Sequence, residues 1–438
     1  MEYRDALDFL DGYVNLEATA GRIHGLSLEA IRGLVGSMGD PQADLAAIHV
    51  TGTNGKGSVA AMTSALLAAA GLRVGSYTSP HVDTIRERLK ISGELISEED
   101  FADLVADLAR YAATLDKRPS YFELLTAAAF LWFSNEAVDA AVVEVGLLGR
   151  FDATNVVESA VSVITNIGFD HTDGVGDWRR AIAGEKAGII ERGRPLVLGD
   201  TSVDLLDIFV AEGPDPLFVR GADFGVSSSS PAVGGQVVDL FGPFGRHDEV
   251  YMSLHGTHQA DNAAVAVTAA EAMLGAPLGD DVVSEAFASL SFPGRLEVVS
   301  NRPLLVLDAA HNPEAARSLV ETVSDVFPGA RRILVLGMLG PRKPGLVVAE
   351  LARLVPDLVI AFTAPSPRAI PAEELELACR QWGLDVEAAP DVTEAVRRAT
   401  ALANEDDLVI VTGSFYVLSG ARSAVEGLIG SDGGEFEG

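Results

Sequence analysis

A glycine-rich loop between an apolar run and an alanine-rich segment most constrains how this chain can fold. Residues 45–52 are mostly apolar and end in glycine, and residues 59–70 are rich in alanine and leucine. This order predicts a strand, a loop and a helix. The small residues of Gly52-Thr-Asn-Gly-Lys-Gly-Ser58 would let backbone N–H groups close around phosphate oxygens, while Lys56 supplies charge and the Ser58 hydroxyl ligates Mg²⁺. We therefore expect a bound nucleoside triphosphate, ATP, rather than a glycine-rich turn without a ligand.

Apolar runs and helical patterns alternate after this loop. Runs typical of strands occur at residues 140–145, 160–167 and 195–199, and segments of helical pattern occupy residues 121–134 and 178–191. Such alternation predicts a mostly parallel sheet covered by helices.

The pattern changes at residue 217 and returns later. Residues 217–252 contain a serine run, many glycines and short alternating segments, which predict a β-rich antiparallel excursion, and a long helix is expected at 262–274. The α/β alternation then resumes, with strands expected near residues 304–307, 333–336, 358–362 and 408–411. Because 438 residues exceed what one core usually supports, we expect two α/β domains: a P-loop-type ATP-binding domain at 1–297 and a Rossmann-like domain at 298–438. The tail after residue 430 is expected to be disordered.

The composition of the chain argues against some classes of binding partner. The formal net charge of -31 argues against nucleic acid and anionic membranes. No apolar run is long enough to span a bilayer, and the first residues do not resemble a signal peptide, so we expect a soluble, cytoplasmic protein. The acidic surface is typical of a GC-rich genome or of adaptation to salt. The single cysteine, Cys379, excludes an intrachain disulfide and is expected to pack in a helix.

The glycine-rich loop is one residue shorter than the common GxxxxGK[ST] form, and this compressed form resembles the nucleotide loop of folylpolyglutamate synthase and dihydrofolate synthase, a branch of the Mur-type ligases. Further blocks resemble that family's motifs in its order, from about residue 20 to residue 425. These blocks are Ser79-Pro80-His81, Glu87-Arg88, Tyr121-Phe122-Glu123, Glu144-Val145-Gly146, Arg150 to Val156, Asp170-His171-Thr172, Glu185 to Ile189, His258-Gln259 with Asn262, Pro293-Gly294-Arg295, Asp308 with His311-Asn312-Pro313, and Gly413-Ser414 with Tyr416.

Two of these blocks suggest a metal site. Glu144 closes one apolar strand and His171 follows another, and ligands of open α/β sheets bind at the carboxyl ends of strands. Together with Ser58 they could hold a divalent cation, although each could also be a buried structural residue. The resemblance adds Ser79 and Lys186 to this set and implies two Mg²⁺ sites.

Lys186 lies in the apolar helical segment 181–190, where an ammonium group is unfavourable unless it is paired or neutralised. An ion pair with Glu144 or Glu185 would satisfy it. The resemblance implies instead that Lys186 is carbamylated, which turns a cation into a carboxylate-like metal ligand.

Contacts to ATP are implied along the whole chain. Arg295 follows a Pro-Gly pair and could reach the triphosphate, or it could simply be an exposed linker residue. By resemblance, nucleotide lies between the two domains, and Lys56, His171, Lys186 and Arg295 are catalytic. The implied nucleotide-binding residues are Thr53, Asn54, Gly55, Lys56, Gly57, Ser58, Asn262, Arg295, Asp308 and His311.

The acceptor site is implied less directly. Phe122 could stack on a pterin or could be a core residue, and Glu123 or Asp152 could hydrogen-bond the pterin amine; Phe151 and Ala153 complete the implied set. The chain departs from the family at Leu148 and Ala309, where glycines are usual, and at 340–344, where an acidic segment is usual. These departures concern the acceptor pocket and the second domain.

The implied reaction is an ATP-dependent ligation. The γ-phosphoryl group would pass to a carboxylate of dihydropteroate or a reduced folate, and the amino group of L-glutamate would then displace phosphate. Either acceptor, or both, would fit, and a monomer is expected. A cell-wall Mur ligase is the alternative enzyme, although a further N-terminal domain would be expected there. A non-catalytic nucleotide-binding homologue is the other alternative, but it would not need Glu144, His171, Lys186 and Arg295 together.

Overall fold

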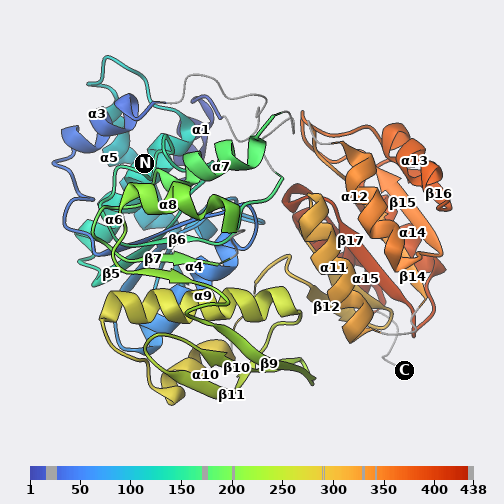
Figure 1. Ribbon diagram of the computed structural model, residues 1–438. Coiled ribbons are helices and arrows are strands. Elements are labelled where there is room, and N and C mark those ends of the chain that lie inside the picture. The colour runs from blue at the N-terminus through green and yellow to red at the C-terminus, as the bar shows by residue number, and fades with distance from the viewer. Residues whose placement is uncertain are drawn as a thin grey trace, which may run out of the picture. The chain divides into compact units, whose positions relative to one another are not determined.

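The computed structural model describes residues 1–15, 27–169, 176–199, 203–288, 290, 292–327, 331–340 and 343–432. The chain divides into two compact units (Figure 1): unit 1 comprises Met1–Ser253 and Thr257–Leu290, and unit 2 comprises Leu254–Gly256 and Ser291–Gly438. Both are α/β, which confirms the predicted fold class. The domain limits 1–297 and 298–438 stay predictions. No helix in the described ranges is long and apolar enough to cross a bilayer.

An eight-stranded sheet forms the centre of unit 1, in the order β4-β3-β2-β5-β1-β6-β7-β8. Its strands are β1 (Ala47–Thr51), β2 (Val74–Tyr77), β3 (Leu89–Ile91), β4 (Glu94–Leu95), β5 (Ala140–Glu144), β6 (Ser159–Ile164), β7 (Leu196–Leu198) and β8 (Leu217–Val219). The strands from β2 to β8 in this order are parallel, and β3 pairs antiparallel with both β2 and β4. Because both faces are covered, β1 and β5 are continuous buried runs.

Helices cover both faces of this sheet (Figure 1). On one side α4 (Lys56–Ala69) and α9 (Thr257–Leu274) pack together and against the central strands. Alternate strand residues such as Ala47 and Ala141 join the core on the other side. The helices of that side are α1 (Tyr3–Asp11), α3 (Glu29–Ser37), α5 (Glu98–Ala112), α6 (Tyr121–Asn135), α7 (Trp178–Ala187) and α8 (Leu206–Glu212), with short turns η1 (Ile85–Arg88) and η2 (Val203–Leu205).

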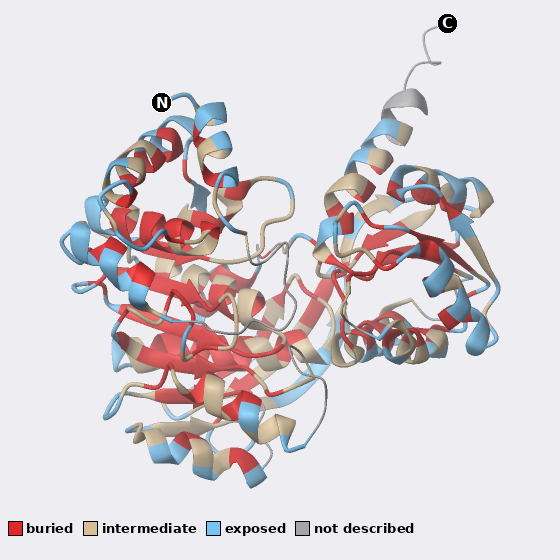
Figure 2. Cartoon of the chain, turned by 90° about the horizontal axis from the view of Figure 1, so that it is seen from above, coloured by how far each residue is buried: buried red, intermediate tan, exposed pale blue. Residues whose placement is uncertain are grey.

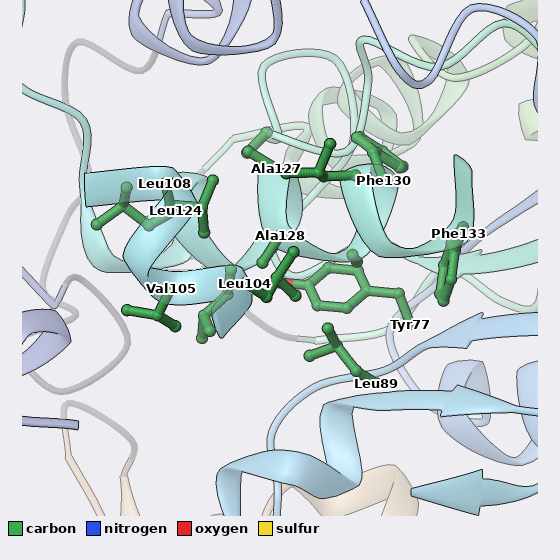
Figure 3. Close-up of a cluster of buried hydrophobic side chains, with 14 of the residues drawn as sticks. Tyr77, Leu89, Leu104, Val105, Leu108, Leu124, Ala127, Ala128, Phe130 and Phe133 are labelled. Carbon is green, nitrogen blue, oxygen red and sulfur yellow. The ribbon is translucent and has the colours of Figure 1, made fainter. Parts of the chain in front are cut away.

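One core cluster of unit 1 surrounds Tyr77 (Figure 3), whose side chain lies among Leu89, Leu104 and Ala128. Its hydroxyl accepts a hydrogen bond from Thr126 Oγ1 of α6 at 3.3 Å, which satisfies the polar end of a fully buried ring. Figure 2 shows that the buried residues concentrate in the strands and on the helix faces that cover them.

The β-rich excursion expected at 217–252 is confirmed as a separate antiparallel sheet only from residue 225, because β8 at its start pairs in parallel with β7 of the large sheet. The antiparallel sheet contains β9 (Gly225–Ala232), β10 (Gly235–Phe241) and β11 (Arg246–Met252) in the order β11-β10-β9, and it packs against α9 and α10 (Asp280–Ala288). The expected start of α9 near Asn262 is wrong: the helix begins at Thr257, because Gln259 and Ala260 are already buried.

Unit 2 contains a six-stranded sheet in the order β12-β13-β17-β14-β15-β16, parallel except for β12. Its strands are β12 (Glu297–Asn301), β13 (Leu304–Leu307), β14 (Arg332–Leu336), β15 (Leu358–Phe362), β16 (Val386–Ala389) and β17 (Leu408–Thr412). Its helices are α11 (Pro313–Val326), α12 (Pro344–Leu351), α13 (Ala372–Gln381), α14 (Val392–Leu402) and α15 (Leu418–Asp432), with turns η3 (Ala352–Leu354) and η4 (Phe415–Val417). Cys379 is buried in α13, as predicted.

Candidate functional site

The glycine-rich loop lies between β1 and α4, as predicted. Gly55 caps α4 in the left-handed conformation, with φ of 81°, and the backbone N–H groups that follow lie at a helix N-terminus, where anions bind. A Cβ atom on Gly52 would lie 1.8 Å from Thr165 Oγ1, and one on Gly55 would lie 2.6 Å from Asn262 Oδ1. Glycine is therefore required at both positions, and Asn262 of α9 lies beside the loop.

Two lysines converge on one carbonyl of this loop. Lys56 Nζ donates to the Gly52 carbonyl at 3.1 Å and to the Thr53 carbonyl at 3.4 Å. Lys186 Nζ, from α7, donates to the same Gly52 carbonyl at 2.7 Å, although Lys186 is only 4% exposed. Two ammonium groups beside a helix N-terminus make this edge of the sheet attractive to phosphate.

Glu144 stands next to the loop at the carboxyl end of β5. It is buried, and its Oε2 accepts a hydrogen bond from the Ser79 backbone N–H at 3.0 Å. A Cβ atom on Gly57 would lie 3.5 Å from the same oxygen, so Glu144 also lies against the start of α4, which carries Ser58. Carboxylate and hydroxyl oxygens are ligands that Mg²⁺ prefers, so the donor types fit the predicted metal.

The predicted metal set is described only in part. Ser58, Ser79, Glu144 and Lys186 lie at the same sheet edge, whereas His171 lies outside the described residues. Within the described ranges, no group of three His, Cys, Asp or Glu side chains could hold a metal ion. Of the described members, only Glu144 belongs to those residue types.

The end of β6 supplies two residues that the sequence reasoning missed. Asn166 Oδ1 accepts hydrogen bonds from the backbone N–H groups of Thr53 and Asn54 at 3.2 and 2.9 Å. Asn166 Nδ2 and Thr165 Oγ1 both donate to the Asn54 carbonyl, at 3.1 and 2.5 Å. The available signal was their position: two polar residues directly after an apolar strand.

Asp152, an expected acceptor-binding residue, is engaged within its own loop. Its carboxylate accepts hydrogen bonds from Leu147 N at 2.8 Å, Thr154 N at 3.0 Å and Thr154 Oγ1 at 2.5 Å. Burial raises the pKa of Asp152 above its usual value. Thr154 Oγ1 also meets His49 Nε2 at 2.8 Å, and burial lowers the pKa of His49 to about 3, so His49 is neutral. His49 Nε2 therefore donates to Thr154, and Thr154 donates to Asp152.

Phe122 and Glu123 open helix α6. Glu123 Oε2 accepts hydrogen bonds from the backbone N–H and the hydroxyl of Ser120, each at 2.7 Å, so its carboxylate caps the helix. The Phe122 ring covers Gly146, where a Cβ atom would lie 2.4 Å from Phe122 Cζ. Phe122 thus lies at the carboxyl end of β5, close to Glu144.

Leu148 stands where the family usually has glycine, and its backbone keeps the left-handed conformation that glycine favours. Leu148 has φ of 58°, and its carbonyl accepts a hydrogen bond from Thr51 Oγ1 at 2.5 Å. A left-handed leucine costs about 1–2 kcal/mol, which this contact helps to offset. Phe151 is 43% exposed and Ala153 is buried, so of these two only Phe151 has an accessible side chain.

A surface pocket of about 540 Å³ lies between this loop and α7 and includes Leu148, Arg150 and Arg180 in its lining. Its two arginines are already paired: Arg150 with Glu212 and Arg180 with Asp207, each at 2.5 Å. The pocket therefore offers little net positive charge to an anionic substrate.

In unit 2, Arg295 and His311 both lie beside one aromatic ring, that of Phe415. The Arg295 guanidinium carbon is 4.5 Å from the Phe415 ring centroid, and the His311 ring centroid is 6.3 Å from it. A cation–π contact holds the Arg295 guanidinium against the Phe415 ring. Phe415 was missed by the sequence reasoning, because an aromatic residue far along the chain carries no sign of this contact.

Asp308 follows β13 and organises the neighbouring backbone. Its carboxylate accepts hydrogen bonds from Leu296 N at 2.9 Å and Ala310 N at 2.8 Å. Burial raises its pKa, and the nearby Arg295 opposes that rise. Ala309, where glycine was usual, is buried, and its carbonyl meets His311 Nδ1 at 2.8 Å. In the other departure, at 340–344, residues 341 and 342 lie outside the described ranges.

Comparisons with known proteins agree with this architecture. Residues 50–270 match the Mur ligase middle domain, and residues 294–415 match the Mur ligase, glutamate ligase domain. The chain is 37% identical to the dihydrofolate synthase/folylpolyglutamate synthase of Mycobacterium tuberculosis, covering 91% of this chain and 89% of that one. It is 33% identical to the Bacillus subtilis protein of the same name, covering 97% and 99%.

Solved structures give the same result. The folylpolyglutamate synthase of Mycobacterium tuberculosis complexed with ADP and AMPPCP matches with a TM-score of 0.90 and 36% identity, over 97% of this chain and 98% of that one. The E. coli FolC protein in complex with DHPP and ADP matches with a TM-score of 0.85 and 28% identity, over 98% and 99%. The chain therefore belongs to the dihydrofolate synthase/folylpolyglutamate synthase family of Mur ligases, as its ordered motifs predicted.

Proposed function

We propose that this protein is an ATP-dependent ligase that joins the amino group of L-glutamate to a carboxylate of a pteroate or folate. One observation carries the proposal: two lysines, a helix N-terminus and the Glu144–Ser79 pair meet at one sheet edge. That combination suits phosphoryl transfer, because it can bind phosphate and also hold a divalent cation. The family membership indicates which carboxylate is activated.

Residues of both units would take part in forming the nucleotide site. In unit 1 these are the loop residues Thr53 to Ser58 and Asn262, and in unit 2 they are Arg295, Asp308 and His311. Lys56 and Arg295 would neutralise charge on the transferred phosphoryl group. Phe415 supports Arg295 in this role, because a stacked guanidinium needs little reordering to bind phosphate.

Ser58, Ser79, Glu144, His171 and Lys186 would hold Mg²⁺, in two sites. Mg²⁺, when bound, supplies neutralisation of the charge that develops on the phosphoryl oxygens. We retain carbamylation of Lys186 as part of the proposal. The buried position of this lysine, beside Lys56 at the Gly52 carbonyl, supports it, because removing one of two neighbouring cations lowers their repulsion.

The reaction has two chemical steps. A carboxylate oxygen of the acceptor attacks the γ-phosphorus, and the bond to the β–γ bridging oxygen breaks, giving ADP and an acyl phosphate. The uncharged amino group of L-glutamate then attacks the acyl carbon, phosphate leaves, and the amine loses a proton to yield the amide. Activation is needed because a carboxylate by itself is a poor acyl donor.

We propose that both dihydropteroate and reduced folates serve as acceptors. The relatives named dihydrofolate synthase/folylpolyglutamate synthase support both. Phe122, whose ring covers Gly146, is the side chain that we propose to stack on a pterin, and Phe151 is exposed five residues after Gly146.

Phosphate release tests the proposal directly. The protein is incubated with ATP, Mg²⁺, L-glutamate and either dihydropteroate or tetrahydrofolate, at low and high salt, with an acceptor-free control. We expect release that depends on both the acceptor and glutamate. Absence of acceptor-dependent release under all these conditions would exclude the ligase, and release only with a UDP-linked cell-wall precursor would favour the other Mur-type activity.

A further inference from the structure

The carboxyl end of β6 holds the first half of the glycine-rich loop. Asn166 accepts hydrogen bonds from two successive backbone N–H groups, those of Thr53 and Asn54, and donates one to the Asn54 carbonyl. Thr165 donates to the same carbonyl and lies so close to Gly52 that no Cβ atom fits between them. Thr53 is anchored again, because its hydroxyl donates to the Gly168 carbonyl at 3.3 Å.

These contacts decide which parts of the loop face a phosphate. The Asn54 carbonyl oxygen, which would repel phosphate oxygens, is turned toward Thr165 and Asn166. The N–H groups of Thr53 and Asn54 are directed to Asn166 Oδ1. The N–H groups from Gly55 to Ser58 remain, at the N-terminus of α4, where helix geometry leaves them without intrahelical acceptors.

A side-chain amide suits this position because it accepts and donates at once. Aspartate could accept from Thr53 and Asn54, but it could not donate to the Asn54 carbonyl and would add a negative charge near the phosphates. An apolar residue could do neither.

We propose that Asn166 is a positioning residue for the triphosphate. Asn166 fixes the first half of the loop so that the Asn54 carbonyl is turned away from the phosphates. The phosphates are then bound by the Gly55–Ser58 N–H groups and by Lys56. Thr53 and Asn54 then shape the loop and do not donate their N–H groups to phosphate. The inference rests on the proposed ATP site but not on the identity of the acceptor.

Nucleotide affinity tests the role without requiring turnover. Binding of ATP with Mg²⁺ is measured by isothermal titration calorimetry for the wild-type protein, Asn166→Ala and Asn166→Asp. We expect Asn166→Ala to weaken binding about 10- to 100-fold, since three hydrogen bonds that order the loop are lost. We expect Asn166→Asp to bind ATP more weakly still, because the new carboxylate repels the phosphates. Added salt should screen this repulsion and recover part of the affinity of Asn166→Asp, whereas it should recover none of the affinity of Asn166→Ala.

Asn404→Ala is the matched control, because Asn404 Nδ2 also anchors a turn, through Asp407 at 3.0 Å, but in unit 2 and outside the proposed site. It should bind ATP like the wild type. Thermal unfolding shows whether each variant is folded, and Asn166→Asp provides a second test if Asn166→Ala fails to fold.

A kinetic measurement separates positioning from a general structural effect. In the folded Asn166 variants, KM for ATP should rise by a factor similar to the loss of ATP affinity. KM for the acceptor, measured at saturating ATP, should stay unchanged. Wild-type ATP affinity in folded Asn166→Ala would overturn the inference and leave the ligase proposal intact. If the wild-type protein itself bound no nucleotide, the proposed function would fail with it.

Discussion

Two partly buried polar networks in unit 1 differ in their expected roles. The loop network comprises Lys56, Lys186, Thr165 and Asn166, whose side chains hold backbone groups of the glycine-rich loop. The histidine cluster lies at the three-stranded sheet: His247 of β11 meets Glu271 of α9 and Asp280 of α10. Helix α9 contributes to the histidine cluster through Glu271, and it also lies beside the glycine-rich loop, where Asn262 is next to Gly55.

The two networks differ in how their charges are balanced. In the histidine cluster, His247 Nδ1 is 2.8 Å from Asp280 Oδ1 and Nε2 is 3.2 Å from Glu271 Oε1, so both ring nitrogens face carboxylates and the cation is matched in place. The loop network instead brings two lysines to one carbonyl and a helix N-terminus. In the histidine cluster the charges balance one another, whereas the positive charge of the loop network is balanced by an anionic ligand. Substitutions should therefore affect stability in one network and activity in the other.

The largest expected effect is that of Lys56→Ala. Removing this ammonium group should lower kcat about a thousandfold, because the charge on the transferred phosphoryl group loses one of the protein cations proposed to neutralise it. The unfolding temperature should stay close to that of the wild type. Lys117→Ala is the control, since Lys117 forms an exposed pair with Glu29 and should leave kcat unchanged. Substantial turnover by Lys56→Ala would mean that the loop network has no catalytic role.

Lys186 provides the next test. Lys186→Ala should lower kcat about 100-fold, the loss typical when a group that supports a metal site is removed. If the lysine is carbamylated, added formate should restore part of the activity by supplying a carboxylate, and it should do nothing for Lys56→Ala. A tryptic mass map and a crystal grown at neutral pH with bicarbonate, both without carbamate, would exclude the modification.

The histidine cluster should show the opposite behaviour. His247→Leu should lower the free energy of unfolding by about 1–3 kcal/mol, because Glu271 stays buried without one of its hydrogen-bond donors, while kcat remains close to wild type. Urea unfolding measures this. Asp280→Asn should cost less, because the Asp280 side chain is 83% exposed. A large fall in kcat for His247→Leu would show that the two networks are coupled through α9.

The pH dependence of that stability follows from the same contacts. Hydrogen bonding to Glu271 raises the pKa of His247 above 6.5. A raised pKa in the folded state means that the imidazolium stabilises the fold fully below about pH 6.5 and that this contribution is lost as pH rises through the raised value. His247→Leu should lack this component, which pH-dependent urea unfolding compares directly. Identical pH profiles for variant and wild type would contradict the assignment.

Salt should have the smallest effect and should act outside both networks. With a net charge of -31, added salt screens repulsion between exposed carboxylates and should raise the unfolding temperature by a few degrees. The buried His247 contribution should hardly change. A lower unfolding temperature at high salt would indicate that exposed ion pairs outweigh the overall repulsion.

The predicted fold was confirmed where the sequence signal was local. Apolar runs that end in glycine or in polar residues identified β1, β5, β6 and β17, and the change in pattern after residue 217 identified the separate antiparallel sheet. The start of α9 was misplaced because its first turn is fixed by burial of Gln259 and Ala260 against other elements, which local pattern does not reveal.

The sequence by itself determined the nucleotide loop, the order of the motifs and so the family, because these depend on residue types at short, fixed spacings. Only the tertiary structure decided what individual side chains do. Asn166 reaches Asn54, His49 reaches Thr154, and Arg295 stacks on Phe415, although each pair lies more than about a hundred residues apart. The carboxylates of Glu123 and Asp152, by contrast, accept hydrogen bonds from backbone groups only three and five residues away along the chain. Hydrogen bonds and ring contacts act over a few ångströms, so their partners are set by which strand ends and loops the fold brings together.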